Sequence, residues 1–103
     1  MTDEELIGAA TAARDKAYAR YSGYYVGAAL FDEHGATHVS CNVENAAYPL
    51  GSCAEAGAIA AMVAAGGTRI RMIAIVGGAG EIAKCTPCGG CRQRIKEFAD
   101  GDT

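Results

Sequence analysis

The chain has 103 residues, half of them hydrophobic, which is enough apolar material for the core of one domain spanning residues 1–103. Its net charge is −3 and it contains no basic run, which argues against nucleic acid as a partner because phosphate binding needs clustered Lys and Arg. No apolar run is long enough to span a bilayer, and the acidic N-terminus lacks the basic-then-apolar order of a signal peptide.

The first half of the chain predicts a helix followed by a hairpin. Alanines and Leu6 recur at three- and four-residue spacing over about residues 2–20, which indicates a helix. Two β-type runs follow, Tyr24–Phe31 and Thr37–Cys41, and a glycine-containing loop joins them. The segment 42–52 contains the Asn, Pro, Gly and Ser residues that are typical of an ordered loop.

The second half predicts a buried helix, a covered strand and a last helix. Residues 53–65 are apolar almost all round apart from Glu55, which is typical of a buried helix. Residues 70–76 are mostly apolar, which favours a strand covered on both faces and parallel to a neighbour. After a glycine-rich turn at 77–80, Pro87 begins a last helix at about residues 88–99. The order α-β-β-α-β-α predicts an α/β fold: a three-layer α-β-α domain with a small mixed sheet covered by helices.

Three cysteines at the predicted starts of two helices form the most informative motif. Cys53-Ala54-Glu55 begins the buried helix, and Pro87-Cys88-Gly89-Gly90-Cys91 begins the last one. Cys88 and Cys91 are three residues apart and share one face of a helical turn, and two helix N-termini would help to offset thiolate charge. Three protein ligands leave one tetrahedral position of Zn²⁺ open, which defines a catalytic site. Although a single cysteine is more often a small buried hydrophobe, the trio predicts one Zn²⁺ per chain held by Cys53, Cys88 and Cys91.

The cysteine count also bears on location. Five cysteines cannot all pair within one chain, so free thiols and a cytoplasmic location are expected.

Several polar residues have two possible roles. Glu55 is either a solvated first-turn residue favoured by the helix dipole or the proton carrier for water at the metal. Asn42 and Glu44 are either solvated turn residues or side chains that project the same way from an extended segment and hold sugar hydroxyls. His34 and His38 lack the spacing of metal ligands, and we expect both to be exposed.

Five segments, taken together, resemble the small, homotetrameric cytidine deaminases. In chain order they are Tyr21-Ser22, Val26 to Leu30, Asn42 to Ala46, Cys53 to Glu55 and Pro87 to Gln93. A Cys or His two residues before a Glu, followed later by P-C-x-x-C, is also the signature of zinc nucleobase deaminases. The resemblance implies a cytidine-deaminase-like fold, the same three cysteines as zinc ligands, and Glu55 as the proton shuttle.

The resemblance further implies a substrate, a substrate site and an assembly. The reaction is hydrolytic deamination of cytidine and deoxycytidine in pyrimidine salvage, by a homotetramer with shared active sites and without nucleic acid or membrane partners. Asn42 and Glu44 would bind the ribose, and Tyr24 would lie against the base. The complete set of substrate-binding residues that it implies is Tyr24, Asn42, Glu44, Asn45, Ala46, Tyr48 and Ala54.

The chain departs from the family pattern at three places. Ala56 stands where many members have an arginine, and Tyr24 stands where phenylalanine is usual. The family normally continues beyond the position of Thr103, so we expect the domain to be C-terminally incomplete. Two alternatives stay open: a related zinc deaminase of another aminopyrimidine such as blasticidin S, and a non-catalytic structural zinc protein.

Overall fold

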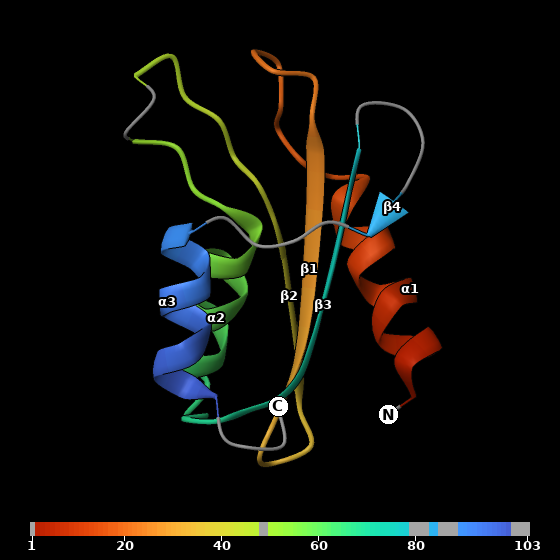
Figure 1. The fold of residues 1–103 in the computed structure, drawn as a ribbon, viewed down its shortest axis with the longest axis vertical. Helices are drawn as coiled ribbons and strands as arrows, with labels where there is room; N and C mark the ends of the chain where they lie inside the picture. The colour runs from red at the N-terminus through yellow and green to blue at the C-terminus, as the bar shows by residue number, and fades with distance from the viewer. Residues whose placement is uncertain (1, 48–49, 79–82, 85–88, 100–103) are drawn as a thin grey trace.

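The computed structural model describes residues 2–47, 50–78, 83–84 and 89–99 (Figure 1). Seven elements are assigned along these ranges. They are α1 (Asp3–Arg14), β1 (Tyr25–Asp32), β2 (Thr37–Cys41), α2 (Ala54–Ala64), β3 (Ile70–Gly78), β4 (Ala83–Lys84) and α3 (Gly89–Phe98). No helix in these ranges is long and apolar enough to cross a membrane.

The elements form three layers around one sheet. The strand order is β2-β1-β3-β4, with α1 on one face of the sheet and α2 and α3 on the other (Figure 1). The predicted α/β three-layer architecture is therefore confirmed. The predicted direction of the third strand is wrong, because β3 runs antiparallel to both β1 and β4. All strand pairs among the described residues are antiparallel, so the parallel pair that a mixed sheet requires is not among them. An apolar run reports cover on both faces, which the two helical layers provide, and it does not report strand direction.

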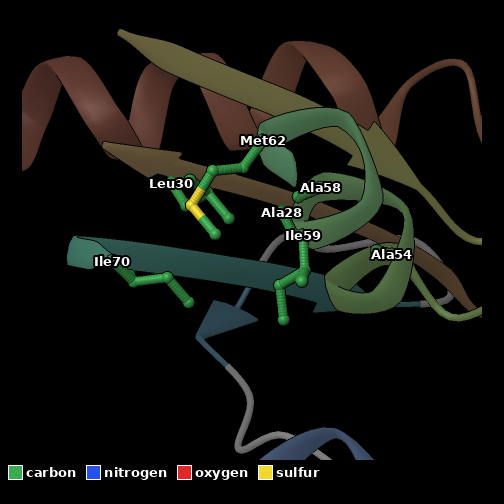
Figure 2. Close-up of a cluster of buried hydrophobic side chains, with 7 residues drawn as sticks. All are labelled: Ala28, Leu30, Ala54, Ala58, Ile59, Met62 and Ile70. Atoms are coloured by element: carbon green, nitrogen blue, oxygen red, sulfur yellow. The ribbon is translucent and has the colours of Figure 1, made fainter. Parts of the chain in front are cut away.

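Alternate residues of β1 supply two separate cores, as expected for side chains of period two. Ala28 and Leu30 face α2 and pack with Met62 (Figure 2). Ala29 faces the other way and packs with Ala10 of α1. Gly27 allows this second contact to be close, because a Cβ there would overlap the carbonyl oxygen of Ala10.

The helix α1 ends well before the predicted boundary near residue 20. Tyr18 instead pairs with the segment after β2: its N–H donates to the Asn42 carbonyl (3.0 Å), and its carbonyl accepts from the Glu44 N–H (2.8 Å). This long-range pairing overrides the helical alanine spacing, and it brings residues 15–22 to the end of the molecule where α2 begins (Figure 1).

The opposite end of the sheet, at the β1–β2 hairpin, contains a buried acid–histidine pair. The Asp32 side chain is 2% exposed, and its Oδ2 lies 2.8 Å from Nε2 of His38. The other oxygen, Oδ1, accepts from the N–H groups of His34 and Ala36, both at 2.9 Å. The expectation that both histidines are exposed therefore holds for His34 and is wrong for His38, which the buried carboxylate draws inward.

A second carboxylate at this end ties β1 to the segment before β3. Glu33 accepts hydrogen bonds from the N–H and hydroxyl of Thr68 and from the N–H of Arg69, at 2.7–3.2 Å. These bonds, led by the one from the Thr68 hydroxyl, lower the pKa of Glu33 to about 2.

Candidate active site

The helices α2 and α3 begin at the same end of the molecule. They lie side by side on one face of the sheet, and both run downward in the view of Figure 1. Ala99, directly after α3, forms a parallel bridge with Ile70, which begins the strand after α2. The helices have 11 and 10 residues, so helices that end together also begin together. The two cysteine motifs therefore belong to helices that start at one end of the fold.

The predicted metal ligands are placed to different degrees. Cys53 is the N-cap residue of α2, and it is exposed and makes no capping hydrogen bond with its side chain. Cys91 is the third residue of α3, but its side chain lies outside what the structure describes, and Cys88 lies outside the described residues altogether. Within the described part of the chain, no group of three His, Cys, Asp or Glu side chains could hold a metal ion. Cys53, the predicted ligand whose side chain is described, nevertheless fits Zn²⁺. Its thiol is exposed at a helix N-terminus, a position that favours the thiolate that Zn²⁺ binds.

Glu55 is buried, so the solvated alternative for this residue is wrong. Its exposed fraction is 5%, in the first turn of α2, two residues after the exposed Cys53. Burying a carboxylate costs folding free energy. Its position beside an exposed thiol indicates that Glu55 has a chemical role.

Asn42 connects the start of β1 to the segment after β2. Its Nδ2 donates to the Tyr24 carbonyl (3.0 Å), and its Oδ1 accepts from the Val26 N–H (2.9 Å). The side chain thus bonds the backbone at the start of β1, a structural role that differs from the solvated turn residue considered from the sequence. The described residues leave one of its N–H groups and one of its acceptor positions unused.

Glu44 is held by the turn that precedes β1. Its Oε1 accepts from the N–H groups of Tyr21 and Ser22, both at 3.0 Å, and its Oε2 is hydrogen-bonded by the Ser22 hydroxyl. These bonds, with that of the Ser22 hydroxyl the largest cause, hold the pKa of Glu44 below its ordinary value. The carboxylate is therefore ionised at neutral pH.

A pocket of about 540 Å³ lies at this end of the molecule, lined by residues 21–22, 42–45 and 51–53. It brings together four predicted site residues: Asn42, Glu44, Asn45 and Cys53.

Of the other predicted site residues, those that the structure describes do not line this pocket. Tyr24 is 44% exposed, and Ala46 is also exposed. The side chain of Ala54 is fully buried, so only its backbone could meet a ligand. Tyr48 lies outside the described residues.

The pocket residues that sequence reasoning missed are Tyr21, Ser22, Val43, Gly51 and Ser52. Ser22 belonged to a motif of the resemblance but was given no role. A serine directly before a glycine turn is a usable signal, because its hydroxyl can bond nearby backbone and carboxylate groups.

Comparisons with known proteins identify the family of the chain. The family model described as "Cytidine and deoxycytidylate deaminase zinc-binding region" matches residues 1–103. The cytidine deaminase of Sporosarcina psychrophila is 42% identical over 101 residues, which cover 98% of this chain and 73% of that protein. The cytidine deaminase of Halalkalibacterium halodurans is 39% identical over 103 residues, covering 100% and 76%.

Solved structures give the same result. The crystal structure of cytidine deaminase from Mycobacterium leprae has a TM-score of 0.89 at 40% identity, covering 99% of this chain and 84% of that one. The one from Burkholderia pseudomallei has a TM-score of 0.86 at 47% identity, covering 95% and 77%. The fold and the matched zinc-binding region define a zinc-dependent α/β hydrolytic enzyme. The chain belongs to the cytidine and deoxycytidylate deaminase family, and its cofactor is Zn²⁺.

Proposed function

We propose that the protein hydrolyses cytidine and deoxycytidine to uridine and deoxyuridine, consuming one water and releasing one ammonia. The observation that carries the proposal is the buried Glu55, two residues after the exposed Cys53, at the end of the fold where the pocket lies. A carboxylate in this position is suited to proton transfer beside a metal, which is what hydrolytic deamination requires.

Zinc would be held by Cys53, Cys88 and Cys91. Support comes from the common end of α2 and α3 and from the preference of Zn²⁺ for thiolate donors. When bound, Zn²⁺ supplies a Lewis acid that lowers the pKa of a coordinated water toward about 7.

Glu55 would carry the protons of the reaction. It takes the first proton from the attacking water and passes it to N3 of the pyrimidine ring. It takes the second from the hydroxyl formed at C4 and passes it to the amine, which leaves C4 as ammonia. Its burial keeps bulk water away from these transfers. The backbone of Ala54, next to Glu55, would hold the edge of the base.

Asn42 and Glu44 would hold the sugar. A carboxylate has about four acceptor positions, and the described part of the chain fills three on Glu44. The position left can accept a sugar O–H, and Asn42 can donate to the same hydroxyl. Asn45, Ala46 and Tyr48 would complete the substrate segment, with Tyr24 against the base.

The charge of the pocket favours a nucleoside over a 5′-nucleotide. Glu44 is ionised, and no Lys or Arg is among the described residues that line the pocket. A phosphate would therefore meet a like charge without a compensating cation. The free nucleoside carries no such penalty.

The remaining proposals concern assembly and location. We infer a homotetramer with sites completed across subunits, supported by the exposed apolar side of α2, where Val63 is 49% exposed, and by Leu50 at 74%. Light scattering tests this assembly. We also place the enzyme in the cytoplasm and in pyrimidine salvage, because thiol ligands need a reducing compartment.

The test of the proposed function is uridine formation from cytidine by zinc-loaded protein, with cytidine 5′-monophosphate and blasticidin S as comparison substrates. We expect turnover of cytidine and deoxycytidine and little turnover of the nucleotide. Blasticidin S is the second candidate because Ala56 stands where many relatives carry arginine. Turnover of blasticidin S alone would transfer the proposal to that substrate, and turnover of nothing would favour a structural zinc protein.

A further inference from the structure

The hydroxyl of Ser22 lies between two of the proposed substrate-binding residues. Its Oγ accepts from the N–H of Tyr24 (3.0 Å) and is hydrogen-bonded to Oε2 of Glu44. The Tyr24 N–H can only donate, and an ionised carboxylate can only accept. The single proton of the hydroxyl must therefore point to Glu44, and its orientation is fixed.

The bonds around Glu44 leave one acceptor position in a defined place. The N–H groups of Tyr21 and Ser22 use both positions of Oε1. The Ser22 hydroxyl uses one position of Oε2. Among the described residues, the position that stays open is thus on Oε2, the oxygen that Ser22 holds.

Tyr24 is held from both sides of its backbone. Its N–H donates to Ser22 Oγ, and its carbonyl accepts from Nδ2 of Asn42. Ser22 therefore joins Glu44 to Tyr24, and Asn42 bonds Tyr24 directly from the carbonyl side.

We infer that Ser22 is a positioning residue for nucleoside recognition, whose hydroxyl orients Glu44 Oε2 toward one sugar hydroxyl and fixes the backbone of Tyr24. The inference rests on the proposed function. The exposure of Ser22 does not weaken it, because a water replacing the hydroxyl would satisfy Glu44 without fixing its direction. The lowered pKa of Glu44, caused first by the Ser22 hydroxyl, agrees with this arrangement.

The chain offers a matched control. At the opposite end, Glu33 accepts from backbone N–H groups and from the Thr68 hydroxyl (2.7 Å), with the same chemistry and away from the pocket. Thr68→Ala removes an equivalent hydroxyl–carboxylate bond outside the proposed site.

The experiment compares Ser22→Ala, Ser22→Thr and Thr68→Ala, each zinc-loaded, with cytidine and with cytosine, which lacks the sugar. For Ser22→Ala we expect KM for cytidine to rise roughly tenfold, the usual loss for one hydrogen bond to a charged group, with a smaller change in kcat and in cytosine turnover. The acid limb of kcat/KM should move to higher pH, because the pKa of Glu44 rises when this hydroxyl is lost. Ser22→Thr keeps the hydroxyl and should restore KM, and Thr68→Ala should leave KM unchanged.

A double-mutant cycle separates positioning from a general structural role. In a Glu44→Gln background, Ser22→Ala should add little further loss, because the partner of the hydroxyl is already altered. Additive losses, or equal losses with cytidine and cytosine, would overturn the inference. If Ser22→Ala does not fold, Ser22→Cys keeps a similar size with a weak donor and replaces it in every comparison. A wild type active on cytidine with an unaffected Ser22→Ala variant overturns this inference alone, whereas an inactive wild type overturns the proposed function and this inference together.

Discussion

Two glutamates at opposite ends of the molecule are held in nearly the same way. Glu33, beside the hairpin, and Glu44, beside the pocket, each accept from two backbone N–H groups and one side-chain hydroxyl. At Glu33 both oxygens share the Thr68 N–H, so three donors make four contacts, two on each oxygen, and the carboxylate is saturated. At Glu44 three bonds come from the described residues and one acceptor position remains.

The neighbours of the two glutamates also differ. Glu33 follows Asp32, whose buried carboxylate is paired with His38. Glu44 lines a pocket together with Cys53, and the start of α2 carries the buried Glu55. Saturated polar groups stabilise the hairpin end, and incompletely used ones mark the end proposed to bind substrate. A carboxylate bonded by backbone N–H groups and a hydroxyl occurs at both ends, so this motif alone does not distinguish a stabilising role from a binding role. The unused acceptor position on Glu44 does.

The largest expected difference between the two ends comes from removing Cys53, the proposed metal ligand whose side chain the structure describes. Cys53→Ala should abolish cytidine turnover and lower the zinc content well below one ion per chain, because two thiolates hold Zn²⁺ far less tightly than three. Elemental analysis and the uridine assay measure both effects. The control is Cys41→Ala, a described cysteine outside the motif. Full zinc occupancy in Cys53→Ala would contradict the ligand set.

A smaller effect is expected at Asn42. Asn42→Ala should reduce kcat/KM for cytidine by roughly 1–3 kcal/mol, the cost of leaving polar partners unpaired, and should change cytosine turnover little. Glu33→Gln, at the saturated end, is the control and should leave both substrates unaffected. Equal losses with cytidine and cytosine would assign Asn42 to structure alone, because its side chain also bonds the backbone of Tyr24 and Val26.

The mildest expected effect is on acid stability, and it belongs to the hairpin end. The folded-state pKa of Glu33 is about 2, below its ordinary value of 4.5. A lowered pKa stabilises the fold fully above pH 4.5, and this stabilisation is lost as the pH falls toward 2. Glu33→Gln should therefore flatten the dependence of the unfolding midpoint on pH in this window, measured by urea unfolding. A variant with the wild-type pH dependence would show that these hydrogen bonds do not persist in solution.

Local features of the fold were predictable from the sequence, and long-range ones were not. The strand β2 has the predicted bounds Thr37–Cys41, and α2 (Ala54–Ala64) begins and ends within one residue of the prediction. Both follow from residue periodicity and from glycines that permit turns. The direction of β3 and the end of α1 were wrong, because each depends on a partner distant in the chain.

The candidate site shows the same division. The motif placed Cys53 and Glu55 at the start of a helix, as observed. The sequence allowed two roles for Glu55, and its burial contradicts the solvated one. Ser22 could not be assigned from the sequence, because its role depends on where Glu44 lies after folding. The motif predicted the residue types, and tertiary contacts decide which of their hydrogen bonds remain available.

The most direct test of the central claim is the turnover of Glu55→Gln with its zinc content measured on the same sample. Glutamine keeps the shape of the side chain and removes its capacity to carry protons. The account predicts full zinc occupancy and a kcat for cytidine lower by a factor on the order of 10² or more, typical for a removed acid–base group. Zinc-loaded Glu55→Gln with near-normal kcat would contradict the account.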